Sequence, residues 1–554
     1  MTSGKTPTSA APRSRRLWVH LRRTSQILFF LLFVWLFLQA EYRSAPQLAW
    51  PVDLFFRFDP LALAVTLLTF SPLVPALLWS LTFVALTLVL GRFFCGWVCP
   101  LGTTLDGLRR LLFSPRPDRG VADRWRRAKY YLLIALLAAA PLSVNLAGLF
   151  DPLSLLYRTL TIVFYPAFSY GVEKGSTVLY HLGPPLSTLS EPVYQLLKAT
   201  VLPFRSLVFL LPFLTLTLFA LIVAAERVDR RFWCRALCPL GALYGIFARF
   251  SLLRRTPASL CPDCGDCAVV CKMGAFKGES QAPGAPALST GRPDEGEAAE
   301  KPAAPGSPPK ARLAPHLSSE CQLCLSCVAA CEKGRPDFVW RRLPRAPLDL
   351  GRRQVITAVA AGVALAPVVR LGSLARRPDE FLLRPPGAQD EGEFLARCIR
   401  CGQCMKVCLT NGLQPVLWEA GLEGLYTPRL IPRLGYCSYG CNLCGQVCPT
   451  GAIPALELPA KQALSLGVAA FDRNRCIPWS EGSDCLVCEE HCPVSPKAIT
   501  FNLGEVITPK GEKVQVKLPV VHPDRCIGCG HCEHVCPVGG QAAVRVRRSL
   551  RVEM

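Results

Sequence analysis

Four apolar stretches divide the first half of the chain, and each approaches the roughly 20 residues that a membrane-spanning helix needs. They lie near Ser25–Ala40, Leu73–Leu90, Tyr130–Ala147 and Leu207–Ala225. Arginines crowd the chain before the first stretch, after the second and after the fourth, whereas residues 148–206 hold few basic side chains. Because basic loops remain on the cytoplasmic side of a membrane, the pattern predicts four helices with both ends of this half in the cytoplasm.

A fifth apolar stretch, residues 354–369, lies in mid-chain between groups of cysteines. Its surroundings, "GRRQVITAVAAGVALAP" (Gly351–Pro367), combine two arginines, an apolar run and an A-x-A pattern, as an export signal does. The run is shorter than a full span, so a buried or interfacial helix is the alternative to a membrane anchor. The arginine flank favours the anchor, and Pro367 should hinder cleavage after Ala366.

The apolar half contains an internal repeat. Its two pairs of segments are RFFCGWVCPLG (Arg92–Gly102) with RFWCRALCPLG (Arg231–Gly241), and FDPL at Phe58–Leu61 and Phe150–Leu153. Two copies in the same orientation imply a pseudo-twofold axis along the membrane normal. Aspartate followed by proline suits the N-cap and first position of a helix. We therefore predict that Asp59 and Asp151 are helix caps, in preference to a role in a quinone site.

Composition changes this picture mainly through the cysteines. The 554 residues carry a formal charge of +22, are 51% hydrophobic and include 28 cysteines, which fall into seven groups of four. This length suggests three or four structural units. The arginines lie beside apolar stretches, as orientation signals do, so the charge does not indicate nucleic-acid binding. No histidine lies in an apolar span, and no C-x-x-C-H or phosphate-binding loop occurs, so the sequence supports neither haem nor a nucleotide.

The repeat supplies two C-x-x-x-C-P pairs, Cys95 with Cys99 and Cys234 with Cys238. Cysteines four residues apart share one face of a helical turn. If the repeats meet, the four thiolates suffice for one metal ion or cluster. Thiols that cycle as a disulfide, or simple packing, are the alternatives.

The first two regular motifs have the spacing C-x2-C-x2-C-x3-C, which wraps a [4Fe-4S] cluster in bacterial ferredoxins and sends its fourth cysteine to the sister cluster. Structural zinc prefers separated ligand pairs. The motifs are Cys261, Cys264, Cys267, Cys271 and Cys321, Cys324, Cys327, Cys331. The swapped pairing predicts two ligand sets, Cys261, Cys264, Cys267, Cys331 and Cys321, Cys324, Cys327, Cys271. Between the motifs, residues 277–315 are rich in Pro, Ala, Gly and Glu and predict a disordered insertion.

Four further groups follow Arg397. The outer two have regular spacing: Cys398, Cys401, Cys404, Cys408 and Cys526, Cys529, Cys532, Cys536. The inner two are irregular: Cys437, Cys441, Cys444, Cys448 and Cys476, Cys485, Cys488, Cys492. This order suggests one two-cluster unit nested within another, in which Cys408 completes the last site and Cys536 the first. Sequential pairing stays open. "CSYGCNLC" also matches a radical S-adenosylmethionine motif, but no β/α-barrel context is visible and Cys448-Pro449 favours electron transfer.

With these motifs in view, residues 1–340 resemble NapH-type membrane ferredoxins, and residues from about 350 to 554 resemble NapG/MauM-type ferredoxins. "RCIRCGQCMKVC", "CNLCGQVCPTGAI" and "RCIGCGHCEHVCP" carry the second match. The chain resembles a fusion of the two. The resemblance implies quinol oxidation and export of the second part through a twin-arginine signal. Such export moves a folded domain, which suits clusters that are built on reduced cytoplasmic thiols.

The predicted fold class is an α-helical membrane domain of four helices, with a fifth candidate at 354–369, plus α+β bacterial-ferredoxin-like modules. The predicted boundaries are 1–255 for the membrane domain, 256–340 for a two-cluster module, 341–375 for the signal or anchor, 376–390 for a linker and 391–554 for a four-cluster module. The expected cofactors are six [4Fe-4S] clusters and a candidate seventh four-thiolate site.

We expect a protein of the bacterial inner membrane whose N-terminus and first module are cytoplasmic and whose last module is periplasmic. The expected partners are membrane lipid, quinol and a protein redox partner such as a periplasmic reductase or cytochrome. No catalytic residue and no independent substrate site are visible. The alternative function is an assembly or regulatory polyferredoxin that supplies electrons for the maturation of a copper oxidase or a nitrous-oxide-type enzyme.

Overall fold

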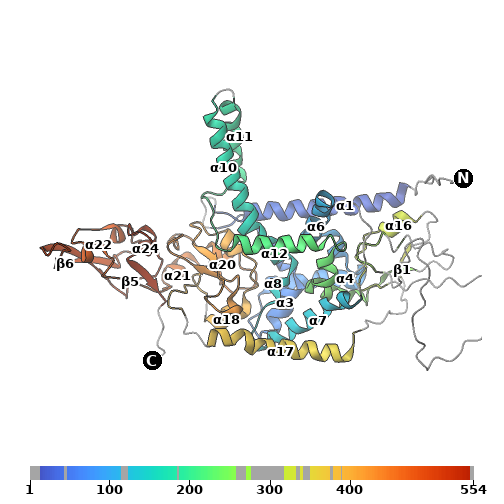
Figure 1. The fold of residues 1–554 in the computed structure, drawn as a ribbon. Coiled ribbons are helices and arrows are strands. Elements are labelled where there is room, and N and C mark those ends of the chain that lie inside the picture. Colours follow the sequence, from blue (N-terminus) through green and yellow to red (C-terminus); the bar gives the residue numbers. More distant parts are fainter. Residues whose placement is uncertain are drawn as a thin grey trace, which may run out of the picture.

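The structure, a computed structural model, describes residues 13–42, 47–113, 123–183, 186–256, 267, 270–275, 317–331, 337–340, 350–374, 379–388 and 390–548. The molecule is elongated, with a bundle of long helices in its middle (Figure 1). Strand β1 and helix α16 lie at one end, and strands β5 and β6 lie at the other. The predicted insertion at 277–315, together with Cys261 and Cys264, lies outside the described residues.

The helical half runs from α1 to α14. Its elements are α1 (Arg13–Gln39), α2 (Leu54–Arg57), α3 (Pro60–Leu68), η1 (Pro75–Trp79), α4 (Ser80–Leu90), α5 (Phe93–Trp97), α6 (Pro100–Leu112), α7 (Asp123–Ala139), η2 (Ala140–Leu142), α8 (Ala147–Phe150), α9 (Pro152–Thr159), η3 (Leu160–Phe164), α10 (Tyr165–His181), α11 (Leu186–Thr200), α12 (Pro212–Ala225), α13 (Phe232–Ala236) and α14 (Pro239–Ala248). Each of the four predicted apolar stretches contains a helix, but the second is divided into η1 and α4.

By length and composition, two of the described helices could cross a membrane, at Leu17–Gln39 and Arg352–Arg370. Helices α4 and α12 are apolar but shorter. The segment 148–206, in which no helix was predicted, contains α9 to α11, and α10 and α11 form a hairpin that projects from the bundle (Figure 1). The apolar-run criterion missed this hairpin because its helices expose many side chains and contain no long uninterrupted apolar run.

Both FDPL motifs cap helices, as predicted. The Asp59 carboxylate accepts a hydrogen bond from the Leu61 amide at 2.9 Å and precedes Pro60, the first residue of α3. The Asp151 carboxylate accepts one from the Ser154 amide at 2.7 Å at the start of α9. Equivalent caps in the two halves agree with an internal repeat.

The mid-chain apolar stretch forms one continuous helix, α17 (Arg352–Leu374), which runs on through Pro367. It packs along α7 so closely that a Cβ atom at Gly362 would lie 2.2 Å from the Ala135 carbonyl oxygen. Ala366 and Val369 are buried against the end of α7. The opposite side of α17 leaves Ile356 and Val368 exposed. The predicted helix is therefore present, with one packed side and one apolar exposed side.

The remaining elements are short and surround the cysteine loops. They are β1 (Leu253–Thr256), α16 (Ser326–Ala330), β2 (Asp337–Trp340), α18 (Glu391–Arg397), α19 (Gln403–Lys406), β3 (Leu413–Pro415), η4 (Leu422–Gly424), β4 (Pro428–Leu430), α20 (Leu443–Gln446), α21 (Leu458–Gln462), β5 (Val468–Phe471), α22 (Ile477–Ser480), α23 (Val487–Glu490), β6 (Ile499–Ile507), β7 (Lys513–Val521), α24 (His531–Val535) and β8 (Val544–Arg547). The strands form four antiparallel pairs, β1–β2, β3–β4, β5–β8 and β6–β7. Within the predicted linker 376–390, residues Leu382 and Leu383 are buried against the C-terminal module, so that module begins before residue 391.

Candidate metal-cluster sites

In the first module the structure groups cysteines from the two distant motifs. We call this group site N; it consists of Cys271, Cys321, Cys324 and Cys327. Burial raises the pKa of Cys321, and the charges of the other three sulfurs raise it further. This is the grouping that the swapped pairing predicts. Of the sister set, Cys267 accepts a hydrogen bond from Arg255 at 3.4 Å, and Cys331 is buried.

The C-terminal module contains four groups, each with three cysteines of one motif and the fourth cysteine of another. Site A is Cys398, Cys401, Cys404 and Cys448, and site B is Cys437, Cys441, Cys444 and Cys408. Site C is Cys526, Cys529, Cys532 and Cys492, and site D is Cys476, Cys485, Cys488 and Cys536. The nested pairing was therefore wrong: Cys408 belongs with its sequence neighbours in site B, and Cys536 lies in site D.

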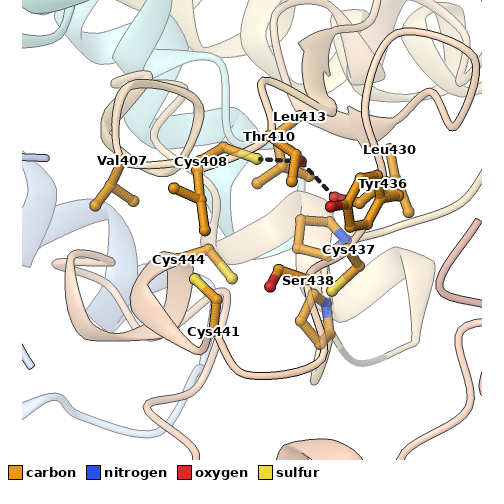
Figure 2. A pocket seen from close by; sticks show the side chains of 13 residues that line it. Val407, Cys408, Thr410, Leu413, Leu430, Tyr436, Cys437, Ser438, Cys441 and Cys444 are labelled. Carbon is orange, nitrogen blue, oxygen red and sulfur yellow. Dashed lines mark hydrogen bonds between the residues drawn. The ribbon is translucent and has the colours of Figure 1, made fainter. Parts of the chain in front are cut away.

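The loop after Cys408 explains the sequential order. Strand β3 pairs with β4, and the backbones at Gly412 and Gly435 approach so closely that a Cβ at Gly412 would lie 2.2 Å from the Gly435 oxygen. Thr410 donates a hydrogen bond to the Tyr436 carbonyl, which brings Cys408 beside Cys437 (Figure 2). Irregular spacing within a motif lengthens a loop of that motif. It does not determine which other motif supplies the fourth cysteine of the site.

The four cysteines of site B line one pocket, whose apolar wall includes Val407 and Leu413. Figure 2 shows the Cys408 sulfur beside the Thr410 hydroxyl, 3.8 Å away. Burial raises the pKa of Cys437 to about 11 and that of Cys529 in site C to about 12. Bare thiols at these positions would be neutral at pH 7, so four thiolates need the positive charge of bound metal. Four sulfurs around an apolar pocket, three of them from one closely spaced motif, fit a [4Fe-4S] cluster.

The four sites follow one another in space. Besides burial, the charge of Cys444 in site B raises the pKa of Cys404 in site A. The Cys437 amide of site B donates to the Cys529 oxygen of site C at 2.8 Å. Cys488 of site D raises the pKa of Cys532 in site C. The spatial order is therefore A, B, C, D.

Site A is the end of this series that contacts the helical half. A Cβ at Gly148 would lie 1.8 Å from the Ile399 oxygen, and Asn145 donates to the Ala396 oxygen at 3.0 Å. Gln403, beside the site A cysteines, donates to the Val52 oxygen at 3.1 Å. Site D lies toward the opposite end, where Figure 1 shows α22 near β6. The sequence carried no signal for this contact, because the side chains of Asn145 and Gln403 bond to backbone oxygens that lie 251 and 351 residues away along the chain.

The two C-x-x-x-C-P pairs also meet, and we call their four cysteines the repeat site. Burial is the main reason why the pKa of Cys99 is raised, and the charges of Cys234 and Cys95 raise it further. Cys238 accepts a hydrogen bond from the Gly241 amide at the start of α14, at 3.2 Å. The expectation that the repeats bring these thiols together is met, and the donor set can hold a four-thiolate cluster.

Two buried arginines cross between the repeats, and sequence reasoning had assigned them only to membrane orientation. Arg231 of the second repeat donates to the Cys95 oxygen of the first at 2.9 Å. Arg92 of the first repeat lies against Gly241 of the second, where a Cβ would be 2.9 Å from its guanidinium. The signal that could have revealed them is their position three residues before the first cysteine of each pair.

The same arginines bind the first module. Arg92 forms an ion pair with Glu320 at 3.0 Å, next to Cys321 of site N. Arg231 forms one with Asp106 at 3.0 Å and donates to the Gln322 side chain at 2.5 Å. The repeat site and site N are therefore held together by the same pair of buried charges.

Comparison with known proteins agrees with these sites. A family model described as a 4Fe-4S binding domain matches residues 72–119 and 211–257, which include all four cysteines of the repeat site. A model described as a 4Fe-4S dicluster domain matches residues 475–540. No solved structure matches the chain.

Several relatives are similar over about a third of this chain. The methylamine utilization ferredoxin-type protein MauM of Methylorubrum extorquens is 37% identical over 211 residues, which cover 36% of this chain and 90% of the relative. MauM of Paracoccus denitrificans is 37% identical over 197 residues, with 35% and 82% coverage. The ferredoxin-type protein NapG of Escherichia coli is 35% identical over 196 residues, again with 35% and 82% coverage.

Proposed function

The chain belongs to the family of ferredoxin-type iron–sulfur proteins that includes MauM and NapG, and from this premise we propose that it carries electrons from membrane quinol to a periplasmic acceptor. The acceptor is a reductase or another redox protein. Six [4Fe-4S] clusters occupy site N, its sister set and sites A to D, and the repeat site holds a seventh.

One observation carries the proposal: the spatial order of sites A to D. A catalytic site would gather its cofactors around one substrate pocket, whereas these sites extend away from the helical half toward a distant end of the molecule (Figure 1). Each [4Fe-4S] cluster exchanges one electron at a potential set by burial and hydrogen bonds. A row of such clusters conducts electrons between a partner at the helical half and a partner near site D.

The helical half supplies the membrane anchor in this proposal. Helices α1 and α17 are long and apolar enough to cross a bilayer, and both lie lengthwise between the two ends of the molecule (Figure 1). Site N then faces the cytoplasm and sites A to D face the periplasm. The arginines before α17 fit a retained twin-arginine signal, as expected of a NapH-type protein fused to a NapG-type protein.

The test is reduction of the clusters by quinol. We expect that a short-chain quinol added anaerobically to the purified chain in liposomes bleaches the broad visible absorption of its clusters. Electron paramagnetic resonance should detect the reduced centres. Clusters that dithionite reduces but quinol leaves oxidised would contradict quinol oxidation and would support the role in metalloenzyme maturation, in which another donor supplies the electrons.

A further inference from the structure

A large cavity lies between the repeat site and site A. Its volume is about 390 Å³, within the range of small-molecule sites. Its walls are mainly apolar side chains of α9, α12 and α13, such as Leu155, Phe219 and Phe232, with Leu425 from the C-terminal module. No described cysteine lines it, so the cavity is distinct from the cluster pockets.

Few of the residues that line this apolar space have polar side chains, and two of these, Trp233 and Tyr426, have unused hydrogen-bonding capacity. Trp233 is 7% exposed, and its indole N–H has no hydrogen-bond partner among the described residues. Tyr426 is bonded to Thr215 at 3.0 Å, and the Thr215 hydroxyl can also donate to the Leu211 oxygen at 2.9 Å. Either hydroxyl can be the donor in the bond between Thr215 and Tyr426, and in both arrangements the phenolic oxygen keeps a lone pair free to accept a hydrogen bond.

Each of the two polar residues connects the cavity to a different thiolate site. Trp233 directly precedes Cys234 of the repeat site. The Tyr426 ring lies 4.3 Å from the guanidinium of Arg158, which donates to the backbone oxygen of Arg400 between two site A cysteines. A molecule in the cavity would thus lie between two thiolate sites, beside one residue that can donate a hydrogen bond and one that can accept.

Exposed apolar residues of α12 border the cavity. Leu218 and Leu221 line the cavity and are also 45% and 62% exposed. The nearby Phe213 and Leu214 extend the same apolar surface. In the proposed orientation this surface contacts lipid, so a ligand that is dissolved in the bilayer can enter without crossing water.

We propose that this cavity binds the head group of a quinol, with the Trp233 indole N–H donating to one ring oxygen and the Tyr426 oxygen accepting from the hydroxyl at the other. The inference rests on the proposed function, which requires a quinol site but does not locate it. A lipid acyl chain could fill the apolar volume but would leave the Trp233 N–H unpaired in a dry cavity, which is unfavourable.

The experiment measures binding of a hydroxyquinoline N-oxide, a fluorescent quinol analogue, to the full chain in detergent. Trp233→Phe keeps an aromatic ring but removes the donor, and should weaken binding about fivefold, as expected for one hydrogen bond. Ala225→Phe fills part of the cavity and should weaken it more. Trp479→Phe is the matched control: its indole N–H is also buried without a partner among the described residues, but it does not line the cavity, and binding should be unchanged.

Iron content and dithionite-reducible absorption of each variant check that it has folded. Unchanged affinity in both folded cavity variants, or a wild-type chain that retains phospholipid and does not bind the analogue, would overturn the assignment. Quinol bleaching of wild-type clusters is measured separately. If bleaching occurs but the variants bind normally, the proposed function stands and the cavity assignment fails; if the analogue binds in the cavity but quinol never reduces the clusters, the reverse holds.

Discussion

The repeat site and the C-terminal sites use the same cysteine donors but are built differently. In the repeat site, buried Arg92 and Arg231 reach from one repeat to the other and on to site N. In site B, close glycine backbones and a threonine hydrogen bond position the sulfurs from within neighbouring loops. The repeat site therefore depends on charges that reach between distant segments, whereas site B depends on the local path of the chain.

The largest expected effect tests the local construction of the C-terminal module. Sequential pairing predicts that Cys408→Ala and Cys441→Ala damage the same cluster, so the double variant should lose about four iron atoms per chain, the content of one cubane. Iron analysis after anaerobic purification measures this number. A loss of about eight would mean that the two cysteines belong to different clusters, as nested pairing requires.

The next effect tests the dependence of the repeat site on charge. Arg231→Gln removes one of the two cations that pair with the half-buried Asp106 carboxylate, and Lys272 remains at 2.6 Å. The cost should therefore lie below the roughly 3–5 kcal/mol of breaking a fully buried pair. We expect a lower thermal midpoint and loss of iron from the repeat site and site N, with sites A to D retained. Spectra of the clusters that remain show which sites have lost iron. Arg227→Gln, at an exposed position beyond α12, is the control for removal of one arginine. Equal iron loss from sites A to D would contradict the comparison.

A third effect tests the contact between the two regions. Gly148→Ala places a methyl group 1.8 Å from the Ile399 oxygen, so the backbones must separate, at a cost of about 1–3 kcal/mol. Proteolysis of the C-terminal module should become faster. Gly171→Ala in α10 is the matched control, because nothing lies within 4 Å of its added Cβ and alanine favours a helix. Equal protection of both variants would show that the contact is loose.

The smallest effect concerns the boundary between sites B and C. The rings of Tyr436 and His531 stack with centroids 3.8 Å apart. His531→Ala should destabilise this boundary by about 0.5–1.5 kcal/mol, the range for aromatic pairs, and hydrogen exchange of the Cys437 amide should rise. Unchanged exchange would indicate that the backbone bond to Cys529 holds the boundary alone.

Much of the architecture could be predicted from local patterns. The aspartate–proline caps, the mid-chain helix and the meeting of the C-x-x-x-C-P pairs follow from spacing and periodicity, because each depends on residues close together in one segment or its repeat. The order of the C-terminal sites did not follow, because it depends on the approach of Gly412 to Gly435 and not on cysteine spacing. The crossed arginines, the α10–α11 hairpin and the contact at Gly148 depend on tertiary packing, for which a single sequence carries no periodic signal.

Sites A to D form a single series, so an electron that travels from one end to the other passes through all four clusters in turn. Among the described residues these four sites have no parallel branch, so the loss of one middle cluster would cut off every cluster beyond it. The slowest electron transfer between two neighbouring clusters would then limit the rate at which the partner near site D is reduced.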